Sequence, residues 1–123
     1  MVTLTVSTQN NCSYCVGAHS VVAQMAGMPA RVLGELRNQQ ILSDHKLDAL
    51  RAFVLSVMAN RGWVPDSTLK SFLDAGYKRR HILDVLTIIA LKTLSNYTNH
   101  IANTPLDEQF SLQKWVAPGS DVA

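Results

Sequence analysis

The chain has 123 residues, of which 47 % are hydrophobic and 16 % are charged, and its formal net charge is +2. This is enough apolar material for the core of one domain, and it argues against disorder. The Lys and Arg residues are dispersed apart from those at 78–80, so we expect no nucleic-acid partner. The most apolar stretch, residues 82–94, contains Asp84 and Lys92 and is shorter than the roughly 20 residues that a bilayer requires. We therefore expect no membrane association either.

The two cysteines, Cys12 and Cys15, have to be interpreted together with the compartment. The first residues lack the basic region that opens a secretory signal peptide, so the cytoplasm is the expected location. In a reducing compartment, two cysteines are better candidates for catalysis or metal binding than for a structural disulfide.

Turn and capping residues divide most of the chain into helices. The expected helices run from Asn10-Asn11 to about Ala26, Pro29 to about Arg37, Ser43 or Asp44 to Gly62, Asp66 to before Gly76, and about Lys78 to Ala102. The last is apolar on most sides, which predicts burial either at the centre of the fold or in a subunit interface. In the tail, residues 111–123, we expect Trp115 to dock and the chain from Pro118 onward to be mobile.

The first residues fit this scheme less well. Val2, Leu4 and Val6 alternate with polar residues, and a period of two with β-branched side chains is typical of a strand. No other segment has a strand pattern, so a strand here would have no partner. We therefore expect residues 2–6 to form the end of a helix.

The segment from Cys12 to His19 carries the chemistry. On a helix, Cys12 and Cys15 are three residues apart and His19 is four residues further on, so all three share one face. The free N–H groups and the dipole at a helix start favour a thiolate. His19 could take a proton from Cys15 or pair with its thiolate.

This arrangement is typical of dithiol oxidoreductases. A thiolate would attack a peroxide oxygen and become a sulfenic acid, and the second cysteine would condense with it to a disulfide. An external reductant would then restore the dithiol by thiol–disulfide exchange.

Two alternatives give these cysteines another role. A zinc site needs about four ligands, and only Cys12, Cys15 and His19 are local. A fourth ligand would have to come from His45, His81 or His100. We therefore expect no metal. The other alternative is a pair of inert core cysteines.

Several motifs resemble the alkylhydroperoxidase D-like, or carboxymuconolactone decarboxylase, family. They are Leu4-Thr5-Val6-Ser7, Asn10-Asn11-Cys12-Ser13-Tyr14-Cys15 and Ala18-His19-Ser20. The later stretch at residues 96–107 is similar to the peroxidase-related branch of that family. The resemblance spans residues 4–110.

The resemblance implies an all-α helical bundle with a central helical hairpin, N-terminally shortened, over residues 1–110. It implies a homo-oligomer, a trimer or hexamer, that reduces organic hydroperoxides without any cofactor or metal. The implied reductant is a dithiol or a protein, in some members a peroxiredoxin. Decarboxylase-branch members generally lack the cysteine pair.

Position by position, Cys12 and Cys15 match the redox cysteines and His19 matches the proton-relay histidine. We expect Cys15 to attack and Cys12 to resolve, although Cys12 lies nearer the helix start and the reverse order also has a physical basis. The family's relay glutamate would fall just before Met1; Glu35 and Asp107 are the available substitutes.

The late helix contributes a second group of candidate residues. Asn96, Asn99 and His100 could form a pocket wall facing the dithiol, or they could be helix surface or a subunit contact. Two other functions remain open for the whole chain. It could be a general thiol–disulfide oxidoreductase, or a non-catalytic helical oligomer that has lost the relay glutamate.

Overall fold

A computed structural model describes residues 1–120 of the chain. In this range it contains only helices: α1 (Val2–Gln9), α2 (Ser13–Met25), α3 (Ala30–Arg37), α4 (His45–Ala59), α5 (Asp66–Asp74), α6 (Arg79–Ala102) and the 3-10 helix η1 (Glu108–Gln113). The expected all-α fold is confirmed. None of the helices in residues 1–120 is both long and apolar enough to cross a membrane.

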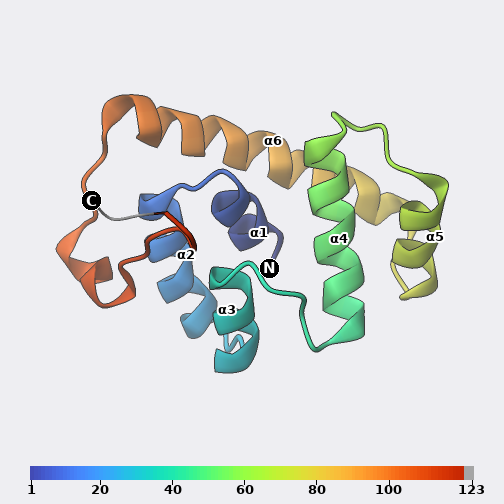
Figure 1. Ribbon diagram of the computed structural model, residues 1–123, viewed down its shortest axis with the longest axis horizontal. Helices are drawn as coiled ribbons and strands as arrows, with labels where there is room; N and C mark the ends of the chain where they lie inside the picture. Colours follow the sequence, from blue (N-terminus) through green and yellow to red (C-terminus); the bar gives the residue numbers. More distant parts are fainter. Residues whose placement is uncertain (121–123) are drawn as a thin grey trace.

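Helix α1 lies at the centre of the fold, where it contacts α2, α3, α4 and α6 (Figure 1). Most of its residues are buried, including the polar Thr5, Ser7 and Thr8. The buried Thr8 hydroxyl has a hydrogen-bond partner within the helix, because its Oγ1 donates to the Thr5 carbonyl at 3.1 Å. The helix expected for residues 2–6 is thus confirmed.

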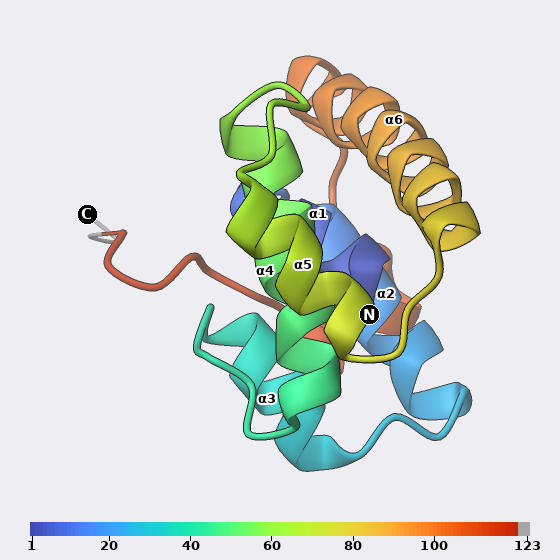
Figure 2. The same cartoon turned by 90° about the vertical axis from the view of Figure 1, so that its right-hand side faces the viewer.

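Helix α6 has 24 residues and lies across one side of the molecule, over α1 and α2 (Figures 1 and 2). Its buried residues are Val85, Lys92 and Asn96, two of which are polar. Its leucines at positions 83, 86, 91 and 94 are exposed. Of the two placements expected for this helix, the centre of the fold is therefore wrong, because these four leucines are exposed in the single chain. The other, burial in a subunit interface, stays a prediction.

Two apolar clusters hold the helices together. In one, Phe72 of α5 stacks between Phe53 of α4 and Tyr77, with ring centroids 4.3 Å and 4.7 Å away. The other joins α1, α2 and α3 and includes Trp115, whose indole Nε1 donates to the Arg37 carbonyl at 2.8 Å. The expected docking of Trp115 is confirmed. The expected mobility of the last residues falls partly on 121–123, which lie outside the described residues.

Candidate dithiol site

A tight turn between α1 and α2 places the first cysteine. Asn11 adopts a left-handed conformation with φ of 54°, and the Cys12 N–H donates to the Ser7 carbonyl at 2.9 Å. Cys12 is the N-cap of α2, which begins at Ser13, so the expected cap at Asn10-Asn11 is wrong by one or two positions. The backbone fixes Cys12 against the end of α1 and leaves Cys15 in the first turn of α2.

Both cysteines are free thiols, and both are buried, with exposed fractions of 1 % for Cys12 and 2 % for Cys15. The two cysteine residues lie close together, with a nearest approach of 2.6 Å. Burial, followed by a hydrogen bond with the Cys15 side chain, raises the pKa of the Cys12 thiol to about 12. The positive charge of Lys92 opposes this rise, but it is a smaller effect than burial. Cys12 is therefore protonated at neutral pH.

Cys15 receives a hydrogen bond from helix α6. The Asn99 Nδ2 donates to the Cys15 Sγ at 3.2 Å. An N–H directed at a sulfur stabilises negative charge on it. Of the two thiols, Cys15 is thus the one that accepts a hydrogen bond from α6.

Asn96 anchors α6 to the turn that carries the cysteines. It is completely buried, its Oδ1 accepts from Asn10 Nδ2 at 3.0 Å, and its Nδ2 donates to Ser7 Oγ at 3.3 Å. Every polar atom of its side chain thus has a partner, as buried amides require. Asn96 holds the turn in place and makes no contact with either sulfur among the described hydrogen bonds.

His19 lies one turn after Cys15 on α2, and its hydrogen-bond partner is Lys92 of α6. The Lys92 Nζ and the His19 Nε2 are 2.8 Å apart. Burial, then the charges of Lys92 and of the Met1 amino group, lower the pKa of His19 to about 4. His19 is therefore neutral at physiological pH.

His100 and Cys12 both line a small pocket of about 190 Å³. The pocket is lined from the α1–α2 turn by residues 11–14 and from the end of α6 by Asn99, His100, Asn103 and Thr104. Cys12 is among these residues and Cys15 is not. Asn99 thus contacts Cys15 and His100 shares a pocket with Cys12, whereas Asn96 is buried between α6 and the turn.

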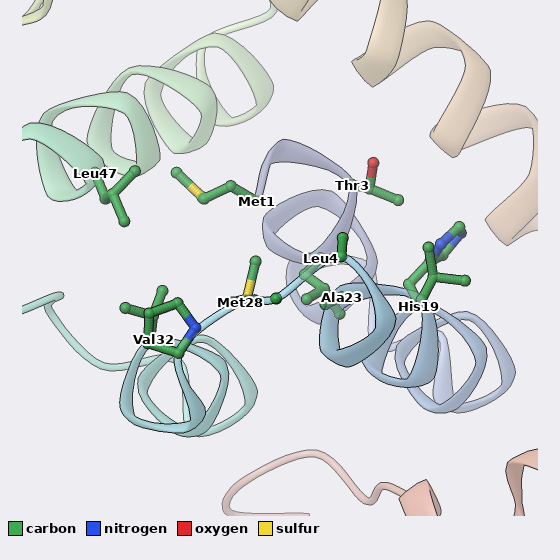
Figure 3. Close-up of a pocket in the computed structure, with 12 residues that line it drawn as sticks. Met1, Thr3, Leu4, His19, Ala23, Met28, Val32 and Leu47 are labelled. Carbon is green, nitrogen blue, oxygen red and sulfur yellow. The ribbon is translucent and has the colours of Figure 1, made fainter.

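A larger apolar pocket of about 370 Å³ is lined by the part of α2 that follows the cysteines (Figure 3). It is formed by residues of α1, α2, the α2–α3 turn, α3 and α4, among them Leu4, Ala23, Met28, Val32 and Leu47. His19 lies at its edge and is the one imidazole in its lining. His19 therefore connects an apolar pocket to the helix turn that carries Cys15.

Neither of the two acids considered as substitutes for a relay glutamate has His19 among its hydrogen-bond partners within residues 1–120. Glu35 accepts from Ser43 and from Arg31. Asp107 accepts from the Tyr14 hydroxyl at 2.8 Å. Tyr14 lies between the two cysteines, so Asp107 fastens the chain after α6 to the motif.

Lys92 is the residue of this site that sequence reasoning missed. Its signal was present, because a lysine interrupts an otherwise apolar stretch of helix. The sequence alone could not show whether that lysine pointed to solvent or inward, since the whole stretch is apolar on both sides.

The group of His, Cys, Asp and Glu side chains that a metal site requires is not found within residues 1–120.

The lowered pKa of His19 predicts a pH-dependent stability. The pKa is about 4 in the fold and about 6.5 when unfolded, so the unfolded chain binds a proton first as the pH falls. Stability is thus lost as the pH falls from about 6.5 towards 4. For a half-buried ring we expect a loss on the order of 1 kcal/mol between pH 7 and pH 5. Urea unfolding of the wild type and of His19→Asn at both pH values measures it, and an equal loss in both proteins would contradict the assignment.

Fold and site together define an all-helical protein with a free dithiol at the start of a helix. The model of the carboxymuconolactone decarboxylase family matches residues 1–53, which include α1, the cysteine motif and His19. This match agrees with the family that the motifs resemble. No curated protein sequence matches the chain.

Proposed function

We propose that the protein reduces hydroperoxides through a cycle in which Cys12 and Cys15 alternate between dithiol and disulfide. The observation that carries the proposal is the pair of adjacent free thiols with different surroundings. Asn99 donates to Cys15, while burial keeps Cys12 protonated. A nucleophile beside a protonated resolving thiol is what a two-step peroxidase cycle needs.

In the first step, the Cys15 thiolate attacks one oxygen of the hydroperoxide. The O–O bond breaks, Cys15 becomes a sulfenic acid, and the alkoxide takes up a proton and leaves as the alcohol. In the second step, the Cys12 sulfur attacks the sulfenic sulfur, a disulfide forms and water leaves. The peroxide has then gained two electrons and the two thiols have lost two.

An external dithiol must reduce the disulfide by exchange. Both sulfurs are almost completely buried, so the reductant needs either a small reactive group or local opening at the α1–α2 turn. We propose a dithiol or a protein with a dithiol, such as a peroxiredoxin, as the electron donor in the cytoplasm. No metal or organic cofactor takes part in these steps.

The proposal is tested by single-turnover reduction of cumene hydroperoxide with the pre-reduced protein. We expect peroxide loss at a rate at least about 10²-fold above that of glutathione at the same thiol concentration. The matched control is the double variant Cys12→Ser/Cys15→Ser, which keeps the helical fold and should lose the peroxide reaction. If disulfide exchange with a small disulfide is fast and peroxide loss is no faster than with glutathione, the protein is a general thiol–disulfide oxidoreductase.

We also propose that a second copy of the chain covers the outer face of α6. Residues 83, 87, 90, 94, 97 and 101 recur at intervals of four and three, and every one is exposed. We call this stripe of Leu, Thr, Ala, Leu, Tyr and Ile the α6 seam. Such spacing gives a helix a continuous line of contact with another helix. A trimer or a hexamer built on the α6 seam would bury it and would leave the dithiol side of the helix unchanged.

A further inference from the structure

Helix α6 directs three polar side chains, in one line along the helix, at residues of the α1–α2 turn and of α2. Lys92, Asn96 and Asn99 follow each other at intervals of four and three, so they share one face of the helix. Asn96 holds the α1–α2 turn, and Asn99 donates to Cys15. Lys92 is the third member of this line, and its Nζ meets His19.

Lys92 is an unusual residue for a helix interior. Its exposed fraction is 8 %, whereas lysines are almost never buried without an anionic partner. The ion pairs within residues 1–120 do not include Lys92. Its hydrogen-bond partner is instead a neutral ring nitrogen, 2.8 Å away. A buried ammonium held in this way costs stability, so a role in the site explains its position better than packing does.

The direction of the hydrogen bond fixes the state of the histidine. An ammonium has three donors and no acceptor, so His19 Nε2 must accept from Lys92. In a neutral ring, the proton then sits on Nδ1. An imidazolium at His19 would put two positive charges 2.8 Å apart, which the charge of Lys92 disfavours.

We propose that Lys92 is a positioning residue of the dithiol site, which holds His19 as the neutral Nδ1–H tautomer and supplies the positive charge next to the thiol pair. The inference rests on the proposed function and specifies the proton path in it. The departing alkoxide takes the Nδ1 proton of His19, while Lys92 passes a proton to Nε2. Nδ1 then takes up from solvent the proton that Cys15 released on ionising, and Nε2 returns its proton to the Lys92 amine, so both groups and the overall charge are restored over one cycle.

Two charged groups act on His19. They are Lys92 of α6 and the amino group of Met1 at the start of α1. Replacing Lys92 removes one of the two positive charges and leaves the other in both proteins. A difference between the proteins therefore reports on Lys92 alone.

The test compares Lys92→Met with the wild type by three readouts. Nitrogen-15 NMR of the histidine rings should show His19 as a neutral Nδ1–H tautomer between pH 5 and 8 in the wild type. In Lys92→Met the titration midpoint of His19 should rise from about 4 without reaching the ordinary value of about 6.5, because burial and the Met1 amino group still lower it. The pH midpoint of thiol alkylation should rise by about 0.5–1 unit in the variant. Peroxide reduction should fall by about 10²-fold.

Two further variants show whether the charge is responsible. Lys92→Arg keeps a buried cation and should restore the NMR signature and most of the rate. Lys70→Met makes the same chemical change at a lysine whose side chain is 75 % exposed, and should behave as the wild type. If His19 titrates near 6.5 in the wild type, or if Lys92→Met changes neither the tautomer nor the alkylation profile, the inference is overturned.

The readouts also separate this inference from the proposed function. Tautomer and alkylation are measured without peroxide. If both change as expected in Lys92→Met while even the wild type fails to reduce peroxide, then Lys92 has the inferred effect on His19 and the peroxidase proposal is the part that fails.

Discussion

Replacing Cys15 by serine should abolish peroxide reduction, to the rate of the buffer alone. Cys15 is the sulfur that Asn99 donates to, whereas burial raises the pKa of Cys12 to about 12 and leaves it without a thiolate near neutral pH. A serine hydroxyl of the same shape cannot ionise in this pH range, so the nucleophile is lost. The measurement is peroxide consumption by the pre-reduced variant in a single turnover.

The complementary variant, Cys12→Ser, should keep the first step and lose the second. It should consume one peroxide per chain and stop at a sulfenic acid on residue 15, which a cyclic diketone reagent traps for mass spectrometry. The order of attack is reversed if Cys15→Ser is the variant that accumulates a sulfenic acid and Cys12→Ser is the inactive one. Either pattern leaves the dithiol cycle in place.

Replacing Leu94 by glutamate should convert the assembly into monomers. Leu94 lies in the middle of the α6 seam and is 68 % exposed in the single chain. In the single chain the substitution therefore costs little stability, whereas in a seam between two copies it buries a charge without a partner. Light scattering with size-exclusion chromatography should show an oligomer for the wild type and a monomer for Leu94→Glu.

The matched control makes the same change on another exposed leucine. Leu112 of η1 is 95 % exposed and lies outside α6, so Leu112→Glu should assemble like the wild type. A wild type that remains monomeric at high concentration would contradict the α6 seam proposal. Loss of assembly in both variants would assign the effect to charge in general.

Sequence patterns predicted the helices well because their ends carry turn and capping residues. Asp44 caps α4 by accepting from the Leu47 N–H at 3.0 Å, as its position before an apolar run indicated. Helix α1 was harder, because a helix buried on every side has no polar face and so gives no helical period. Its alternating residues resembled a strand, and only the lack of a partner argued for a helix.

The cysteine motif and His19 could be predicted because they are local in sequence. The partners of these residues could not, since Asn99 and Lys92 reach them from α6 across separations of 84 and 73 residues. Their contacts depend on the rotation of α6 about its own axis. The apolar residues on both sides of that helix do not determine the rotation, so the outward direction of the leucines was not predictable either.

The central claim is that one hydroperoxide oxidises both cysteines of one chain. The most direct measurement is the intact mass of the pre-reduced protein after one equivalent of cumene hydroperoxide, followed by peptide mapping without reduction. The account predicts the loss of two hydrogens and a single bridge between Cys12 and Cys15, reversed by a dithiol. Unchanged mass and two free thiols after complete mixing, or a bridge between two chains, would contradict it.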